Sequence, residues 1–202
     1  MKTVIFDIGN VLVHFSYQQM LERLAHHYNV PAERVRQMFV EEGLSARYES
    51  GKVSTEEMFL ELGGLSALTP HSDLIVEAMG DIFHENSSIV PIVHALKKQG
   101  KRLIILSNTS PIHWNYIKEN FSIVDLFDER VLSFEVGAIK PQKEIYEAAL
   151  LKAACAPEEC FYTDDIIEYV TIARTFGIDA EQYLDTPTLK KQLLLRMGDI
   201  FK

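Results

Sequence analysis

The stretch TVIFDIGNVLVHF, residues Thr3–Phe15, opens with an apolar run that ends in a carboxylate, Asp7. The chain then turns at Gly9 and Asn10 before a second apolar run begins. A continuous apolar run of this kind is typical of a strand buried on both faces of a parallel sheet. Because such sheets bind ligands outside the carboxyl ends of their strands, Asp7 is a candidate functional residue.

The composition is that of an ordinary globular protein. The chain has 202 residues, of which 47% are hydrophobic and 24% are charged, enough for one sizeable core and a small appendage. A net charge of −9 argues against nucleic acid and anionic membranes as main partners. The sequence has no apolar run of about 18 residues and no visible secretory signal, so we expect a cytoplasmic protein, as a monomer or weak homodimer. Two cysteines, Cys155 and Cys160, are then expected to be free thiols.

After the opening strand the apolar pattern becomes helical. One helical face is formed by residues spaced three and four apart: Tyr17, Met20, Leu21, Leu24, Ala25 and Tyr28. A second helix is expected after Pro31, a third at Ser54, where Ser54-x-x-Glu57 forms a capping box, and a fourth over residues 72–83. We find no convincing strand between residues 14 and 85, so this segment is predicted to be helical.

Beyond residue 86, strands and helices alternate. Strands are expected at 102–107, 130–134, 160–163 and 178–183, and helices at 89–99, 111–121, 143–154, 166–176 and 187–197. This alternation predicts an α/β fold with a parallel sheet that helices cover on both faces.

Polar residues stand at the ends of the expected strands. Asp7 ends the first, Ser107 ends another and is followed by Asn108 and Thr109, and Asp164-Asp165 follow a third. Each of these has a local explanation as a turn former or helix cap. Together they fit phosphoryl transfer, as does Lys140, which precedes a proline at a helix entry.

The residue types explain why that chemistry is favoured. Carboxylates from two strands, Asp7 and the pair Asp164-Asp165, suit Mg²⁺, which binds one or two carboxylates and substrate phosphate. Asp7 could then act as a covalent nucleophile. Ser107 and the amides after it would bind phosphoryl oxygens, and Lys140 would neutralise charge in the transition state.

Four motifs, FDIGNVLV, ILSNTS, GAIKP and FYTDD, resemble in this order those of the haloacid dehalogenase-like hydrolases. The resemblance covers nearly the whole chain and implies a Rossmann-like, doubly wound core of residues 1–14 and 86–202. It also implies a four-helix cap of the C1 class, inserted at residues 15–85. RYESGKVSTEEMF in this insert is similar to the cap of the branch with bacterial sugar-phosphate (glucose-1-phosphate) phosphatases and the phosphatase domain of soluble epoxide hydrolases.

The same resemblance implies the metal site. Asp7 is expected to be the nucleophile and a metal ligand, and the backbone carbonyl of Gly9 another ligand. Asp165 is expected to bind the metal directly, with Asp164 either as a further ligand or behind it.

The resemblance also implies the substrate contacts. Ser107, Asn108 and Lys140 are expected to bind the phosphoryl group. His113 resembles a histidine common near the entrance of such sites, with helix packing as the alternative. Arg47 and Tyr48 are expected to contact the leaving group, with a surface ion pair of Arg47 to Glu49 or a neighbour as the alternative.

Two positions depart from the family pattern. Most phosphatases of this family carry a second aspartate two residues after the nucleophile, which protonates the leaving group and later activates water. This chain has Gly9 there, and Tyr169 stands where Asn or Asp is common.

Three functions therefore remain open. The first is a Mg²⁺-dependent phosphatase of a small phosphorylated metabolite, such as a sugar phosphate. The others are a 2-haloacid dehalogenase-type hydrolase, which needs no metal, and a catalytically weak metabolite-binding protein. The pair Asp164-Asp165 favours the phosphatase, since two adjacent acids at this edge have no evident role without a cation.

Overall fold

The computed structural model describes residues 1–200 and has a central sheet of five parallel strands in the order β5-β4-β1-β6-β7. The strands are β1 (Thr3–Phe6), β4 (Arg102–Ser107), β5 (Glu129–Leu132), β6 (Cys160–Asp164) and β7 (Asp179–Gln182). The predicted α/β class with a parallel sheet is confirmed. The buried strand that opens the sequence, β1, lies at the centre of the sheet, between β4 and β6.

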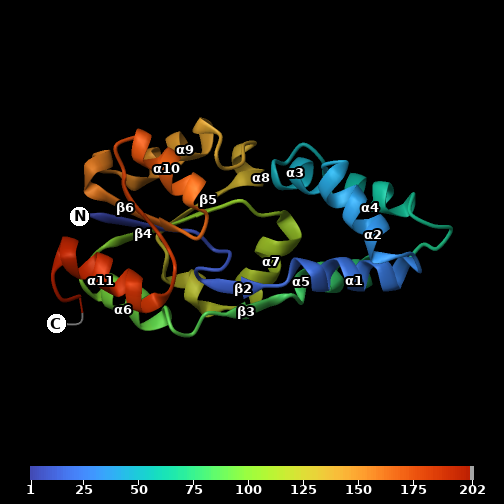
Figure 1. Cartoon of the computed structure of the whole chain (residues 1–202), viewed down its shortest axis with the longest axis horizontal. Helices are drawn as coiled ribbons and strands as arrows, with labels where there is room; N and C mark the ends of the chain where they lie inside the picture. The colour runs from blue at the N-terminus through green and yellow to red at the C-terminus, as the bar shows by residue number, and fades with distance from the viewer. Residues whose placement is uncertain (201–202) are drawn as a thin grey trace.

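Helices cover both faces of this sheet (Figure 1). The α-helices of this part of the chain are α6 (Val90–Lys98), which precedes β4, and α7 (Pro111–Asn120), α8 (Ser133–Val136), α9 (Lys143–Ala153), α10 (Ile167–Thr175) and α11 (Thr186–Met197), which come after it. Alternate side chains of β1 enter different apolar clusters. Val4 and Phe6 pack with residues of α6 and α11, whereas Ile5 packs with residues of α9 and α10.

Between β1 and the rest of the sheet the chain forms a group of helices that we call the helical insertion. It comprises α1 (Tyr17–Tyr28), α2 (Ala32–Arg36), a π-helical turn (Gln37–Glu41), α3 (Leu44–Glu49), α4 (Thr55–Gly63) and α5 (Ser72–Gly80). The capping box at the start of α4 is present: Ser54 Oγ accepts from the Glu57 amide at 3.1 Å, and the Glu57 carboxylate accepts from the Ser54 amide at 2.8 Å. The expectation of four helices omits α3, which buries only Leu44 and Tyr48 and is too short to show a helical period.

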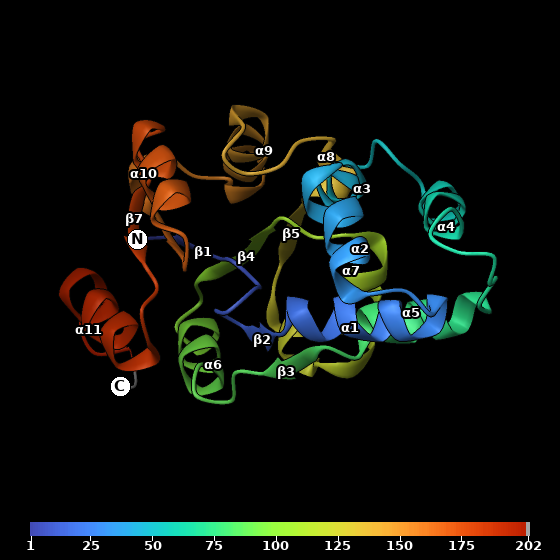
Figure 2. The same cartoon turned by 45° about the vertical axis from the view of Figure 1, so that its right-hand side comes forward.

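A two-stranded antiparallel ribbon, β2 (Val13–Phe15) with β3 (Phe83–Glu85), connects the sheet to the helical insertion (Figure 2). The prediction that no strand lies between residues 14 and 85 is therefore wrong. Each of these strands has three residues, of which only the first is buried, so neither shows the alternation by which strands are recognised.

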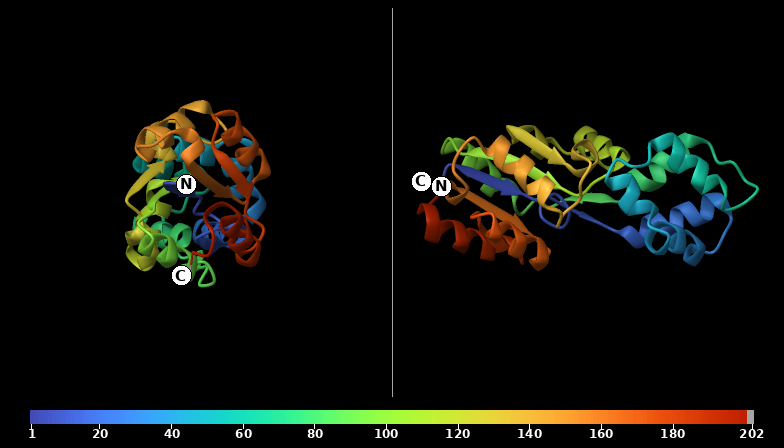
Figure 3. Two further views of the ribbon diagram at one scale, coloured as in Figure 1. Left: turned by 90° about the vertical axis from the view of Figure 1, so that its left-hand side faces the viewer. Right: turned by 90° about the horizontal axis from the view of Figure 1, so that it is seen from above.

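The helical insertion lies at one end of an elongated molecule, and the N-terminus lies at the other (Figure 3). One buried apolar cluster is continuous between the two parts, since it contains Phe6 of the sheet and Met20, Tyr48 and Met58 of the insertion. The boundaries of the predicted cap, residues 15–85, stay a prediction. Cys155 and Cys160 are free thiols, as expected. None of the helices in residues 1–200 is long and apolar enough to cross a membrane.

Candidate active site

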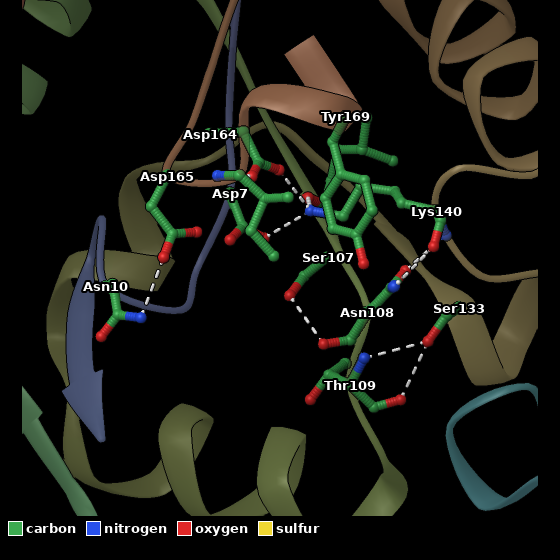
Figure 4. Close-up of polar contacts among 12 residues, drawn as sticks. Asp7, Asn10, Ser107, Asn108, Thr109, Ser133, Lys140, Asp164, Asp165 and Tyr169 are labelled. Carbon is green, nitrogen blue, oxygen red and sulfur yellow. Dashed lines mark hydrogen bonds and ion pairs between the residues drawn. The ribbon is translucent and has the colours of Figure 1, made fainter. Parts of the chain in front are cut away.

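The predicted acids Asp7, Asp164 and Asp165 lie with Ser107, Asn108 and Lys140 at the carboxyl ends of the three central strands (Figure 4). Parallel pairing places Phe6 of β1 beside Thr163 of β6, and the Asp7 amide continues this pairing by donating to the Thr163 carbonyl at 3.0 Å. Ser107 ends the neighbouring strand β4. Asp7 therefore projects from the middle of the sheet edge, with polar residues on both sides.

Lys140 is the cation of this site. Its side chain is 1% exposed, and its amine forms ion pairs with Asp7 Oδ1 at 2.8 Å and Asp164 Oδ2 at 2.6 Å. The amine also donates to the Leu106 carbonyl at 3.2 Å and lies 5.0 Å from the centre of the Tyr169 ring. Burial alone would lower the pKa of Lys140, but the two carboxylates outweigh it and raise that pKa, so the amine stays charged.

Asn108 holds the backbone of Lys140 in place. The Lys140 amide donates to Asn108 Oδ1 at 2.7 Å, and Asn108 Nδ2 donates back to the Lys140 carbonyl at 3.1 Å. The next residue, Thr109, is held through its amide and its carbonyl by the Ser133 hydroxyl, at 2.9 and 3.0 Å. The side-chain amide of Asn108 therefore positions the lysine that pairs with Asp7. The predicted contact of Asn108 with phosphate stays a prediction, and the residue lines the cavity described below.

The two adjacent acids have different surroundings. Asp164 is fully buried; Lys140 and the Tyr162 hydroxyl donate to its Oδ2, and the Ile166 amide donates to its Oδ1 at 2.8 Å. Asp165 is half-buried and accepts from Asn10 Nδ2 at 2.9 Å. Lys140 thus gives Asp164 a role that needs no metal, and only Asp165 lacks a cationic partner within residues 1–200.

Three carboxylates converge at this point. One oxygen from each of Asp7, Asp164 and Asp165 lies within 4.8 Å of the others. Burial raises the pKa of Asp7, as do the charges of the other two acids, while Lys140 opposes the rise; burial also raises the pKa of Asp165. A single lysine does not balance three clustered carboxylates, so their chemistry fits a divalent cation with oxygen ligands.

These groups open into a cavity of about 240 Å³ between the sheet edge and the helical insertion. The sheet edge and the segments that follow its strands contribute Asp7, Gly9, Ser107, Lys140 and Asp165. The insertion, the ribbon and α7 contribute Tyr17, Glu49, Phe15, Phe83 and His113. The cavity therefore has Asp7, a fixed lysine and the half-buried Asp165 on one side and a mixed polar and aromatic wall on the other.

Comparison with known proteins agrees with this geometry. The family model described as haloacid dehalogenase-like hydrolase matches residues 1–177. The chain belongs to this family.

Its similarity to individual members of the family extends over most of the chain. A D-ribitol-5-phosphate phosphatase of Bacteroides thetaiotaomicron is 23% identical over 188 residues, which cover 90% of this chain and 91% of that protein. A sesquiterpene phosphatase of Aspergillus oryzae is 23% identical over 179 residues, 88% and 87% of the two chains. A solved structure of a HAD family enzyme from Bacteroides thetaiotaomicron, in complex with magnesium and inorganic phosphate, has the same fold. Its TM-score is 0.80 at 23% identity, with 90% of this chain and 93% of that chain covered.

In this haloacid dehalogenase-like protein, the surroundings of Gly9 leave little room for a side chain. A Cβ atom added at Gly9 would lie 3.0 Å from Cε1 of Phe15, which is closer than nine in ten real Cβ contacts, and 3.8 Å from Asp7 Oδ2. The Phe15 ring therefore lies against Gly9, in the space that a side chain at this position would enter.

His113 both packs and lines the cavity. Its ring meets Phe83 edge-on, with 5.3 Å between the ring centres. Its Nε2 atom is buried and has no hydrogen-bond partner in the described chain. Burial lowers the pKa of His113 to about 4, so the ring is neutral near pH 7. The two predicted alternatives, packing and a place at the site, are thus compatible.

Arg47 is not brought to the site. Its guanidinium donates to both carboxylate oxygens of Glu61 on α4, at 2.8 and 2.6 Å, and it does not line the cavity. Residues two apart on a helix project roughly 200° apart, so when Glu49 faces the cavity Arg47 faces away. The alternative of a surface ion pair describes this residue, with Glu61 rather than Glu49 as the partner. Tyr48 is buried, its hydroxyl lies 2.8 Å from Thr55 Oγ1, and it does not line the cavity either, so the expected contact with the leaving group has no support in the structure.

Several residues of the site were not predicted. The helical pattern places Tyr17 on the buried face of its helix, and the sequence suggests Glu49 only as an ion-pair partner of Arg47. Tyr162, Ser133 and Asn10 carried no signal of their own. Their contacts depend on which strands and helices become neighbours.

Proposed function

We propose that this protein is a Mg²⁺-dependent phosphatase that hydrolyses the phosphate monoester of a small metabolite through an aspartyl-phosphate on Asp7. The observation that carries the proposal is the cluster of Asp7, Asp164 and Asp165 at the cavity. Lys140 pairs with the first two of these acids, and Asp165 has no ion-pair partner within residues 1–200. Membership of a hydrolase family and similarity to two phosphatases support it.

The donor set fits Mg²⁺. Asp7, the Gly9 carbonyl and Asp165 would hold the ion, since all three residues line the cavity. Asp164 does not line it, and Lys140 and the Ile166 amide already bind its two oxygens, so it would lie behind the ligands. When bound, the ion supplies positive charge that offsets the repulsion between the phosphate and the carboxylates.

The residues of the chain then have defined tasks. The Asp7 carboxylate attacks phosphorus, and the bond to the leaving oxygen breaks. The Lys140 amine and the Ser107 hydroxyl bind phosphoryl oxygens, and their fixed positions favour the transition state. Water then attacks the aspartyl-phosphate and releases inorganic phosphate. Lys140 keeps its proton throughout, because two carboxylates hold it.

The wall formed by the helical insertion supports a hydroxylated leaving group. The Tyr17 hydroxyl and His113 Nε2 are buried without partners in the described chain, and both residues line the cavity beside Glu49. Alcohol groups of a sugar or polyol phosphate would satisfy them. D-ribitol 5-phosphate, which a relative hydrolyses by its name, has this chemistry.

A dehalogenase is less well supported. Such an enzyme needs an aspartate nucleophile but no metal, and the ion pairs of Lys140 with Asp7 and Asp164 suit either chemistry. Asp165 favours the phosphatase, because within residues 1–200 its half-buried carboxylate accepts a side-chain hydrogen bond from the Asn10 amide and has no ion-pair partner. The predicted cytoplasmic location, oligomeric state and absence of nucleic acid or membrane partners stay predictions.

The test is phosphate release from sugar phosphates, polyol phosphates and an aryl phosphate, with and without Mg²⁺. We expect metal-dependent release by the wild type and a loss on the order of 10³-fold or more in Asp7→Asn. Asp73→Asn is the matched control, since Asp73 is exposed on α5. Mg²⁺ should also raise the Tm of the wild type.

Each alternative has its own outcome. Metal-independent release of halide from a 2-haloacid, without phosphate release, would identify a dehalogenase. A rise in Tm with Mg²⁺ and no turnover of any phosphate would identify a binding protein. Full activity in Asp7→Asn would refute the covalent intermediate.

A further inference from the structure

The proposed reaction moves a proton twice, and the residues already assigned leave no group for it. The leaving oxygen must take up a proton when its bond to phosphorus breaks, and the water of the second step must lose one. Gly9 has no side chain, and the ring of Phe15 fills the space beside it.

Most polar residues of the cavity fail one of these two tasks. Lys140 is held by two carboxylates that raise its pKa, so it does not release a proton. His113 has a pKa lowered to about 4 by burial and carries no imidazolium proton near pH 7. Burial raises the pKa of Tyr17 to about 12, which makes its phenolate too scarce to accept a proton from water. Asp7 and Asp165 are occupied as nucleophile and metal ligand.

Glu49 is the carboxyl group that remains. It is the last residue of α3 and lines the same cavity as Asp7, from the opposite wall. Its Oε1 accepts a hydrogen bond from the Ser45 hydroxyl, one helical turn earlier, at 3.1 Å. No lysine or arginine in residues 1–200 forms an ion pair with Glu49, so the carboxyl is free to exchange a proton.

The surroundings of Glu49 favour that exchange. Burial raises the pKa of Glu49, whereas the Ser45 hydrogen bond and the charge of Lys140 oppose the rise. The titratable and charged groups that line the same cavity come from several elements: Tyr17 on α1, Asp7 after β1, His113 on α7, Lys140 before α9, Asp165 after β6 and Tyr169 on α10. Only one of them, Lys140, is cationic near pH 7.

We propose that Glu49, supplied by the helical insertion, is the general acid and base of the phosphatase reaction. This inference rests on the proposed function. The sheet edge would supply the nucleophile and the phosphoryl-binding groups, and the insertion would supply the proton. A side chain from the opposite wall would thereby take the role that Gly9 cannot fill.

The two steps balance as follows for a dissociated phosphate monoester. A carboxylate oxygen of Asp7 forms a bond to phosphorus, and the electron pair of the broken P–O bond stays on the leaving oxygen. That oxygen takes the proton of the Glu49 carboxyl, which gives the alcohol and leaves Glu49 as carboxylate. In the second step a water oxygen bonds to phosphorus while Glu49 takes its proton. The electron pair of the P–O(Asp7) bond returns to Asp7, which restores both carboxyl groups and releases inorganic phosphate.

The test compares Glu49→Gln with the wild type on two substrates that differ in their need for an acid. An alkyl phosphate, such as a polyol phosphate, has a leaving oxygen that must be protonated. The leaving group of p-nitrophenyl phosphate departs as a stable anion. Since kcat/KM reports the step up to departure of the leaving group, Glu49→Gln should lower it on the order of 10²–10⁴-fold for the alkyl phosphate. For the aryl phosphate we expect a change below about threefold, since no general-acid contribution is lost there.

Two further signatures follow from the second step and from pH. With p-nitrophenyl phosphate, Glu49→Gln should release one equivalent of nitrophenolate in a burst and then turn over slowly, because water lacks its base. The wild-type kcat/KM for the alkyl phosphate should fall as pH rises through the Glu49 pKa, and Glu49→Gln should lack this fall. Glu56→Gln, the same change at an exposed position on α4, is the matched control and should behave as the wild type.

The results that overturn the proposal are distinct from those that overturn the proposed function. An equal loss of kcat/KM on both substrates, or no loss on either, would show that Glu49 does not transfer the proton. A wild type that releases no phosphate from any substrate would overturn the phosphatase itself, and the role of Glu49 with it. The unchanged aryl kcat/KM also shows that the variant is folded.

Discussion

The two walls of the cavity differ in how their polar groups are satisfied. On the sheet side, the Lys140 amine has two carboxylate partners, Asp7 and Asp164, at 2.8 and 2.6 Å. On the other side, the Tyr17 hydroxyl and His113 Nε2 are buried with no partner in residues 1–200. They are two of four such side-chain atoms in this part of the chain, the others being Thr163 Oγ1 and Gln192 Oε1.

This difference indicates that the two walls bind different parts of the substrate. Leaving a buried polar atom without a partner costs about 1–3 kcal/mol, a cost that a bound ligand removes. On the sheet side, Lys140 and Asp164 have their partners without substrate, and such fixed groups suit binding of the phosphoryl group that every substrate shares. The opposite wall is incomplete, which suits recognition of the leaving group. The groups that bind the phosphoryl group and the groups that select the leaving group would then lie on opposite walls.

The largest expected effect on stability comes from removing the ion pairs of Lys140 on the sheet side of the cavity. Lys140→Met removes the one cation that pairs with Asp7 and Asp164, and should lower the free energy of unfolding by about 3–5 kcal/mol, because buried carboxylates lose their partner. Phosphate release should be lost as well. Urea unfolding measures the first effect, at neutral pH and without Mg²⁺.

Lys143→Met is the control for this change. Lys143 is exposed, lies three residues further along, and only approaches Glu147, at 3.9 Å. Its loss should change the free energy of unfolding by less than about 1 kcal/mol. Equal effects of the two substitutions would mean that the buried ion pairs contribute nothing special, and the contrast between the walls would fail.

The sheet side of the site is also the part that the sequence predicts well. Asp7, Ser107 and Asp165 stand at the ends of apolar runs that form strands. The carboxyl ends of adjacent parallel strands lie at the same edge of a sheet, so the order of apolar runs in the sequence predicts that these residues lie close together. Lys140 was found by its place between two such strands. The structure brings all four to one cavity.

The other wall depends on tertiary packing that the sequence pattern does not record. The packing of the helical insertion on the rest of the protein determines which residue of α3 faces the cavity. Glu49 faces it, whereas Arg47, the predicted contact of the leaving group, points away and pairs with Glu61. Asp164 pairs with Lys140 and Asp165 does not. This difference depends on the position of the Lys140 amine, which the spacing of residues in the sequence does not reveal. The short ribbon of β2 and β3 buries too little to show a period.

An intermediate effect is expected from His113 when the pH is lowered. Its pKa is about 4 in the folded protein and about 6.5 in the unfolded chain, so below pH 6.5 the unfolded state binds the proton. Stability from this residue is present above pH 6.5 and is lost as pH falls toward 4. Between pH 7 and pH 5 the loss is about 2 kcal/mol.

Urea unfolding at the two pH values checks this expectation. His113→Gln should remove about 2 kcal/mol from the difference between pH 7 and pH 5, whatever it does to stability at pH 7. His94→Gln, at an exposed position of α6, should keep the wild-type difference. The same pH dependence in His113→Gln as in the wild type would show that His113 is not held neutral by the cavity wall.

The smallest expected effect compares two tyrosines directly. The Tyr116 hydroxyl donates to Asp81 Oδ1 at 3.0 Å, so Tyr116→Phe should lower the free energy of unfolding by about 1 kcal/mol. The Tyr17 hydroxyl has no such partner, and Tyr17→Phe should leave the free energy of unfolding unchanged or raise it by up to about 1 kcal/mol.

For KM the expectation is reversed: Tyr17→Phe should have an effect and Tyr116→Phe none. Tyr17→Phe should raise KM for a polyol phosphate several-fold while leaving KM for p-nitrophenyl phosphate unchanged, because the hydroxyl finds its partner only in a hydroxylated leaving group. Tyr116 does not line the cavity, so Tyr116→Phe should alter neither KM. If Tyr17→Phe instead costs stability and spares both KM values, the Tyr17 hydroxyl is satisfied without substrate. The Tyr17 hydroxyl would then have a partner without substrate, as Lys140 does, and other residues of the cavity would have to determine specificity.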